Sequence, residues 1–190
     1  SLILAVIDID HFKKVNDTYG HAIGDMTIRL LTDSIRKAIR SNDKLFRYGG
    51  EEFVVILEGC DMKDARLIAE KIRTLFIAAK SCTANSSNSK SDTIEITFPK
   101  SVSIGVSAMP DFSRDIWECI KQADLALYEA KETGRNRVIK YSPELKVKEA
   151  QKNKKADVAQ DNQNNTDSVV NIDDDSDEAT FLESLKLNRN

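Results

Sequence analysis

Residues 45–57, LFRYGGEEFVVIL, decide the fold, because they predict two strands joined by a tight turn at Gly49 and Gly50. A glycine pair between two runs of apolar, aromatic and β-branched residues is typical of a β-hairpin. Two carboxylates, Glu51 and Glu52, follow the glycines directly. Gly-Gly turns are common, so an ordinary type I′ hairpin with solvated glutamates remains an alternative to a ligand site.

The start of the chain supplies a second pair of carboxylates. Residues 2–7, LILAVI, form an apolar run that predicts a central strand, and Asp8 and Asp10 follow it. Mg²⁺ takes oxygen ligands from one or two carboxylates and from substrate phosphates. If the hairpin lies beside this strand, Asp8 and Glu51 face each other and can hold Mg²⁺ against a triphosphate. The alternative is that the two aspartates cap the next turn.

The rest of the first 145 residues alternates between helical and strand patterns. Residues 8–24 are polar and predict a loop with one helical turn, and residues 80–93 predict a second loop. Asp61 is a candidate N-cap and Gly134 a candidate C-cap glycine. Helices are predicted over about 25–39, 62–76 and 115–132, and further strands over 94–98, 102–108 and 137–141. This order predicts an α/β (α+β) fold, ferredoxin-like or palm-like, whose central, mostly antiparallel sheet is flanked by helices.

Charge separates the chain into two parts. Residues 1–150 carry 23 basic and 22 acidic side chains, whereas residues 151–190 carry 5 and 9. The nearly neutral first part has no basic stripe, which disfavours nucleic-acid binding. We therefore expect a folded domain over residues 1–145 and an acidic, disordered tail over 146–190.

Other features concern the compartment. No apolar run approaches the roughly 20 residues that span a bilayer, so no membrane segment is expected in this chain. The three cysteines, Cys60, Cys82 and Cys119, fit no zinc or redox spacing. Free thiols favour a reducing, cytoplasmic location, although a parent protein can still be anchored to a membrane.

Two cations lie near the end of the third predicted helix. Lys131 and Arg135 are four residues apart, a spacing that places both on one side of a helix. They can neutralise a polyphosphate. Alternatively, they only interact with the negative end of the helix dipole.

Four separated segments resemble the diguanylate cyclase family, also called the GGDEF-domain family, in a GGEEF variant. These segments are DIDHFKKVNDTYGHAIGD (8–25), RYGGEEF (47–53), VSIGVS (102–107) and DLALYEAKETGRNRV (124–138). The resemblance implies that two GTP molecules are condensed into cyclic di-GMP with release of two pyrophosphates. It implies Mg²⁺, or Mn²⁺, as cofactor and a homodimer as the active species. A silent GGDEF-like receptor that binds GTP or cyclic di-GMP is the alternative.

The resemblance also implies roles for single residues. Asp8, the Ile9 carbonyl, Glu51 and Glu52 correspond to metal ligands, and Glu51, assisted by Glu52, to the group that helps deprotonate the ribose 3′-hydroxyl. An aspartate and an asparagine can read the edge of guanine, which suits Asp25 and Asn16. The substrate-binding set implied is Phe12, Lys13, Asn16, Asp25, Gly49, Gly50, Lys131 and Arg135.

An inhibitory product site is implied just before the signature. Arg40 and Asp43 form an R-x-x-D pattern at the family's usual offset, and Lys71 stands where relatives carry a second basic residue. An ordinary ion pair at the end of a helix is the alternative for Arg40 and Asp43. Family members also begin with a helix some 25–30 residues upstream, so we expect the domain in this chain to lack that first helix.

Overall fold

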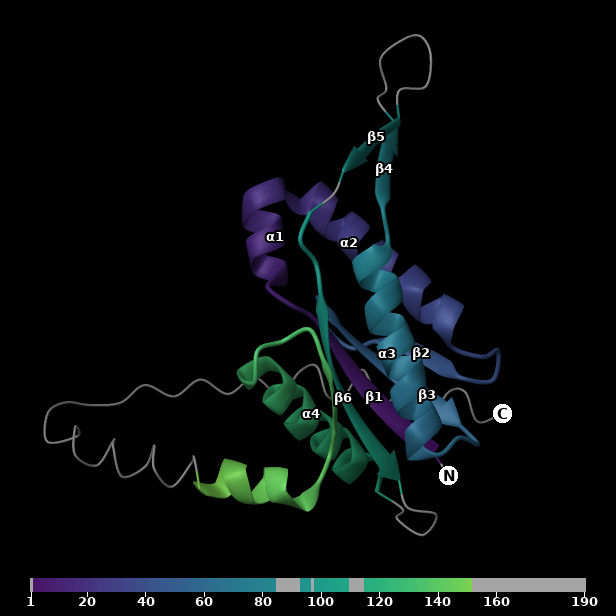
Figure 1. The fold of residues 1–190 in the computed structure, drawn as a ribbon, viewed down its shortest axis with the longest axis vertical. Coiled ribbons are helices and arrows are strands. Elements are labelled where there is room, and N and C mark those ends of the chain that lie inside the picture. Colours follow the sequence, from purple (N-terminus) through teal and green to yellow (C-terminus); the bar gives the residue numbers. More distant parts are fainter. Residues whose placement is uncertain (1, 85–92, 97, 110–114, 152–190) are drawn as a thin grey trace, which may run out of the picture. The chain divides into compact units, whose positions relative to one another are not determined.

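The computed structural model describes residues 2–84, 93–96, 98–109 and 115–151. Its centre is a five-stranded sheet in the order β2-β3-β1-β6-β7 (Figure 1). Only β6 and β7 pair in parallel, which confirms the predicted mostly antiparallel sheet. The five strands are β1 (Leu2–Ile9), β2 (Lys44–Arg47), β3 (Glu52–Glu58), β6 (Val102–Met109) and β7 (Val138–Lys140).

Helices cover both faces of this sheet. On one face, α2 (His21–Ala38) and α3 (Met62–Ala78) share a hydrophobic core with the odd-numbered residues of β1, such as Ile3 and Ile7. Side chains alternate along a strand, so Leu4, Val6 and Asp8 belong to the other face. That face carries α4 (Ile116–Glu132), which packs on β6 and β1. The layers therefore place the end of β1 beside α4.

Gly105 in β6 allows α4 to lie unusually close to the sheet. A Cβ atom at this position would contact the main-chain oxygen of Ala123 and the main-chain nitrogen of Leu127, and would lie 2.9 Å from the Leu127 Cα. Main-chain atoms inside a helix cannot move away as a flexible side chain can. The spacing between α4 and the sheet therefore depends on a glycine at position 105.

The predicted loop over residues 8–24 is wrong. The segment contains α1 (Phe12–Tyr19) and the first turn of α2, which begins four residues earlier than expected. Only Phe12 and Val15 of α1 are buried, so its apolar stripe is too narrow to stand out in the sequence. Gly20, at a φ of 81°, separates the two helices.

The predicted loop over residues 80–93 is also wrong at its two ends. β4 (Ser81–Ala84) pairs antiparallel with β5 (Thr93–Ile96) in a separate two-stranded sheet. The strand predicted over 94–98 thus belongs to this second sheet. A ribbon of two strands is held by backbone hydrogen bonds, which polar residues form as well as apolar ones. Residues 85–92 lie outside the described part.

Two helix ends follow their sequence signals. Asp61 caps α3 by accepting a hydrogen bond of 2.8 Å from the Asp64 amide. Gly134 follows the C-cap of α4 at a φ of 119°. Within the described residues, no helix combines the length and the apolar character needed to cross a membrane.

The end of the described chain differs from the expected tail. Contacts divide the chain after Leu145, and residues 143–151 are helical. The prediction of disorder from residue 146 is therefore wrong for 146–151, where Lys, Glu and Ala favour a helix. The rest of the predicted tail, 152–190, lies outside the described residues.

Candidate active site at the ends of β1 and β3

The antiparallel register brings the two sequence-predicted carboxylate pairs together. Asp8 is the register partner of Glu52, and the Ile9 amide donates to the Glu51 carbonyl at 3.3 Å. The expected neighbourhood of β1 and the hairpin is thus present. The partner directly opposite Asp8 is Glu52, however, while Glu51 lies one position before the start of β3.

The Gly-Gly turn is not a type I′ hairpin turn. That turn type needs positive φ at both central residues, and neither Gly49 nor Gly50 has one. The turn is closed by the amides of Tyr48 and Gly49, which both donate to the Glu52 carbonyl. No atom lies within 4 Å of the position that a Gly50 Cβ would occupy. The glycine there leaves space against the main chain.

Asp8 is buried and has one cationic partner. Its carboxylate lies 2.8 Å from the Lys131 ammonium, and only 8% of its side chain is exposed. Burial raises the pKa of Asp8, and the negative charge of Asp10 adds to this, whereas Lys131 and Arg135 oppose it. The rise prevails, so the single ammonium does not fully offset the burial of this charge.

Glu51 and Glu52 add to the same excess of negative charge. Burial raises the pKa of both groups, the charge of Asp8 raises them further, and Glu52 also acts on Glu51. Lys131 lowers both, but less. The site therefore crowds several carboxylates around one ammonium.

Asp124 is a member of the site that the sequence reasoning missed. It lies on α4 seven residues before Lys131, which is two helical turns and the same face. Burial of its carboxyl and the charge of Glu52 raise the pKa of Asp124 to about 6, although the residue as a whole is exposed. The two-turn spacing to Lys131 was the signal available. We call Asp8, Glu51, Glu52 and Asp124 the carboxylate cluster.

Asp10 does not belong to the carboxylate cluster. It is 5% exposed and accepts hydrogen bonds of 2.6 Å from the hydroxyls of Ser101 and Ser103. A carboxylate with such partners has little capacity left for a metal ion. Of the two aspartates after β1, the structure therefore leaves Asp8 as the candidate ligand.

The two predicted guanine readers lie on neighbouring helices. Asn16 is on α1 and the exposed Asp25 on α2, directly after Gly24. A Cβ at position 24 would contact the Asn16 Oδ1 atom, which is buried and has no hydrogen-bond partner in the described residues. An unpaired buried acceptor is costly and suits a position that a ligand donor completes.

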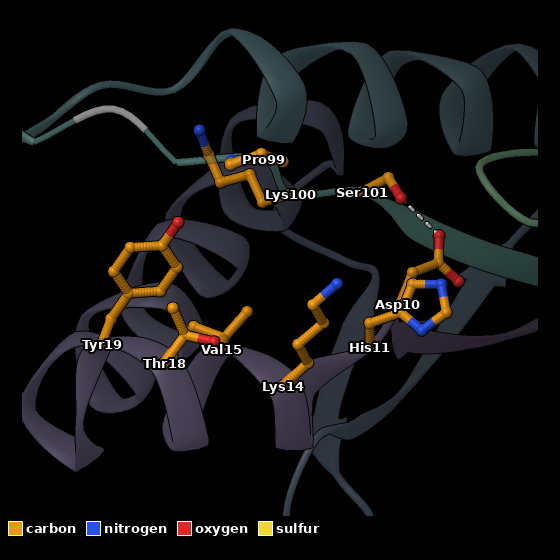
Figure 2. A pocket seen from close by; sticks show the side chains of 9 residues that line it. All are labelled: Asp10, His11, Lys14, Val15, Thr18, Tyr19, Pro99, Lys100 and Ser101. Carbon is orange, nitrogen blue, oxygen red and sulfur yellow. Dashed lines mark hydrogen bonds between the residues drawn. The ribbon is translucent and has the colours of Figure 1, made fainter.

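Phe12 and Lys13, in the first turn of α1, belong to the implied substrate-binding set, but only one of their side chains is exposed. The Phe12 side chain is buried in the hydrophobic core, so only its main chain can contact a substrate. Lys13 is exposed, and no side chain caps the first turn of α1. Amides at an uncapped helix start can bind phosphate oxygens. Between α1 and the segment 99–101 lies a separate cavity of about 410 Å³, which is lined by residues such as Lys14 and Tyr19 (Figure 2).

The residues of the implied inhibitory site have contrasting surroundings. Asp43 is 8% exposed, and its carboxylate accepts from the main-chain amides of Arg40 and Glu58 at 2.8 and 3.2 Å. The described residues show no ion pair between Arg40 and Asp43, which was the alternative interpretation of this pattern. Arg40 and Lys71 are both exposed. Asp43 thus stabilises the turn after Arg40, whereas the side chains of Arg40 and Lys71 face solvent.

The donor set fits a hard divalent cation that shares its coordination with a substrate. All potential ligand atoms of the carboxylate cluster are oxygens. The pKa values of its carboxyl groups are raised, and a bound dication would lower them again. Among the described residues, no group of three acidic, His or Cys side chains is close enough to form a complete metal site. Phosphate oxygens would complete the shell, as is usual for Mg²⁺.

The layered fold and this carboxylate-lined sheet end define a palm-like domain of the nucleotidyltransferase type. The model of the family described as "Diguanylate cyclase, GGDEF domain" matches residues 1–137. The chain belongs to this family. It is 43% identical over 136 residues to the probable diguanylate cyclase DgcT of Escherichia coli K12. It is 40% identical over 138 residues to diguanylate cyclase A of Treponema denticola. These matches cover 70% and 73% of this chain, but only 28% and 34% of the relatives.

Solved structures show the same fold. The active GGEEF domain of a Vibrio cholerae diguanylate cyclase superposes with a TM-score of 0.64 at 33% identity, over 74% of this chain and 83% of that one. The GGDEF domain of Caulobacter crescentus DgcB, solved in complex with c-di-GMP, gives 0.61 at 34% identity, over 73% and 77%. The first of these shares the Glu-Glu form of the signature found here at Glu51 and Glu52.

Proposed function

We propose that this domain is one half of a dimeric diguanylate cyclase site, which joins two GTP molecules into cyclic di-GMP and releases two pyrophosphates. The carboxylate cluster around Lys131 carries the proposal. Its unbalanced negative charge at the ends of β1 and β3 suits a dication bound to a triphosphate. The names of the relatives, among them active cyclases, support the same reaction.

Mg²⁺, or Mn²⁺, would be held by Asp8, the Ile9 carbonyl, Glu51 and Glu52. When bound, the metal neutralises phosphate charge and aligns the reacting oxygens. Glu51 acts as the base that takes the proton of the ribose 3′-hydroxyl, and Glu52 supports it. Its raised pKa brings Glu51 closer to working pH, which favours proton transfer.

The remaining residues bind and orient GTP. Asn16 and Asp25 read the guanine edge, with the Asn16 Oδ1 atom accepting a base N–H that it lacks in the free domain. The open main chain at Gly50, next to Gly49, lets the nucleotide approach. The phosphates contact Lys13, the Phe12 main chain, Lys131 and Arg135.

Two domains must meet for this product to form. Each 3′-oxygen attacks the α-phosphorus of the GTP held by the other domain, a P–O bond to pyrophosphate breaks, and the proton passes to Glu51. A homodimer brings the two half-sites face to face. The buried cysteines Cys60 and Cys119 form no disulfide, which suits the reducing cytoplasm, where we place the reaction.

We further propose that cyclic di-GMP inhibits the domain at Arg40, Asp43 and Lys71. The exposed side chains of Arg40 and Lys71 offer donors for guanine or phosphate oxygens, and Asp43 fixes the turn that presents Arg40. The complex of the Caulobacter crescentus domain with c-di-GMP supports a product-binding role in this family.

The test uses the chain alone and the chain fused to a dimeric coiled coil. Each is incubated with GTP and Mg²⁺, and the products are analysed by mass spectrometry. We expect cyclic di-GMP and pyrophosphate, with a higher rate for the fused dimer. GTP binding without any product in the dimer would contradict the enzyme and support a silent receptor.

A further inference from the structure

The carboxylate of Asp10 joins three parts of the chain that are distant in sequence. It accepts from the Ser101 hydroxyl just before β6, from the Ser103 hydroxyl within β6, and from the Asn136 amide after α4. The three donor–acceptor distances are 2.6, 2.6 and 3.0 Å. Figure 2 shows the first of these bonds. All three bonds are charge-assisted, and such bonds are the strong ones.

The segment held by the third bond has an unfavourable backbone. Gly134, Arg135 and Asn136 have φ values of 119°, 60° and 48° in succession. Two adjacent residues other than glycine in the left-handed region persist only where their surroundings hold them. Asn136 is held on both sides, by Asp10 at its amide and by the Arg73 guanidinium, 2.8 Å from its side-chain oxygen.

Arg135 lies inside this held segment. Its main-chain amide donates to the Ala130 carbonyl at 2.9 Å, and its carbonyl accepts from the Arg137 side chain at 2.9 Å. Its positive charge reaches Asp8, whose pKa it lowers. The side chain therefore starts from a main chain that is fixed on every side, at the edge of the carboxylate cluster.

We propose that Asp10 helps to position Arg135 for contact with the triphosphate. By accepting the hydrogen bond from the Asn136 amide, Asp10 fixes the turn from which the Arg135 side chain extends. The inference rests on the proposed function, in which Arg135 contacts phosphate. An effect of the Asp10 charge alone and a loss of positioning would change substrate binding in opposite directions. Removal of the Asp10 charge takes a negative group away from an anionic substrate and should strengthen its binding, whereas loss of positioning weakens it.

The test is a double-mutant cycle on the whole chain. Binding of a non-hydrolysable GTP analogue with Mg²⁺, and of guanosine, is measured by calorimetry and NMR titration for Asp10→Asn, Arg135→Ala and the double variant. We expect Asp10→Asn to weaken binding of the analogue about tenfold, to leave guanosine unchanged, and to add nothing in the Arg135→Ala background.

Ser103→Ala is the matched control, because it removes a donor to the same carboxylate without touching the turn. It should lower the melting temperature but leave the preference for the analogue over guanosine unchanged. Additive losses in the cycle, or tighter analogue binding by Asp10→Asn, would overturn the positioning role. If the unaltered chain binds no analogue, the proposed function itself fails, which is a separate and recognisable result.

Discussion

Asp8 and Asp10 are two residues apart and equally buried, at 6% and 5% exposure, yet their surroundings are opposite. Asp10 has three hydrogen-bond donors from its own chain. Asp8 has a single ammonium and neighbours of its own charge, Glu51 and Glu52. A buried carboxylate with complete partners stabilises the fold, whereas one with incomplete partners is available to a ligand.

The largest expected effect lies in the carboxylate cluster. Glu51→Gln keeps the size of the side chain but cannot accept the proton or bind a metal ion as a carboxylate. Cyclic di-GMP production should fall by about 10³-fold or more, since general bases contribute about 10²–10⁴. Mass spectrometry of the products measures this, with circular dichroism to verify folding. The control is Glu58→Gln, at the exposed far end of β3, which should keep full activity.

The second effect concerns stability and separates the two aspartates directly. Asp10→Ala leaves two hydroxyls and an amide without their acceptor and should cost about 3 kcal/mol of unfolding free energy. Asp8→Ala should cost about 1 kcal/mol, because the partly exposed Lys131 ammonium can turn to water. Urea denaturation measures both. Equal losses would contradict the distinction between a structural carboxylate and a ligand carboxylate.

Arg40 and Asp43 show the same contrast between a side chain that is available to a ligand and one that stabilises the fold. The expected effects of substituting them are smaller. Arg40→Ala should weaken cyclic di-GMP binding about tenfold and leave stability unchanged, because its side chain faces solvent. Asp43→Ala should instead cost about 2 kcal/mol of stability, since two main-chain amides lose their acceptor. Calorimetric titration and denaturation measure the two effects. Lys37→Ala, which removes another exposed cation, serves as the control; a loss as large as that of Arg40→Ala would argue against a specific site.

The smallest effect is a pH-dependent gain in stability for Asp124→Asn. The folded pKa of Asp124 is raised from 3.8 to about 6, so ionisation disfavours folding increasingly as pH rises through that range. A neutral amide avoids this cost. The variant should be about 1 kcal/mol more stable at about pH 8, a figure reduced for partial exposure, and nearly equal at about pH 4. Urea denaturation at both pH values measures the difference, and a constant gain across pH would exclude the carboxyl as its cause.

Much of the fold follows from the sequence, because its signals are strong and local. The apolar run of β1, the glycine turn before Glu51 and the periodic faces of α3 and α4 predicted the sheet and its layers. The α1 helix was missed because tertiary contacts of Phe12 and Val15, rather than a wide apolar stripe, hold it. β4 was missed because its four residues, Ser81–Ala84, include no large apolar side chain, whereas a strand was predicted where β5 lies.

The site was predictable in its residues but not in its register. Sequence reasoning brought Asp8 near the hairpin, but a shift of one residue places Glu52 opposite it instead of Glu51. The Gly-Gly turn joins β2 to β3 and does not set this register. The register between β1 and β3 depends on which residues of the two strands share a buried face. The division of labour between Asp8 and Asp10 depends on Ser101, Ser103 and Asn136, which lie more than 90 residues further along the chain. No local pattern marks such partners.

Gly105 has a consequence for how variants of this domain behave. It sets the height of α4 above the sheet, and Lys131 lies one turn after Leu127, whose main chain rests on that glycine. Any side chain at position 105 would push the helix outward and carry Lys131 away from Asp8. A genetic screen for inactive variants should therefore recover position 105, where a substitution removes activity without altering a residue that contacts nucleotide or metal.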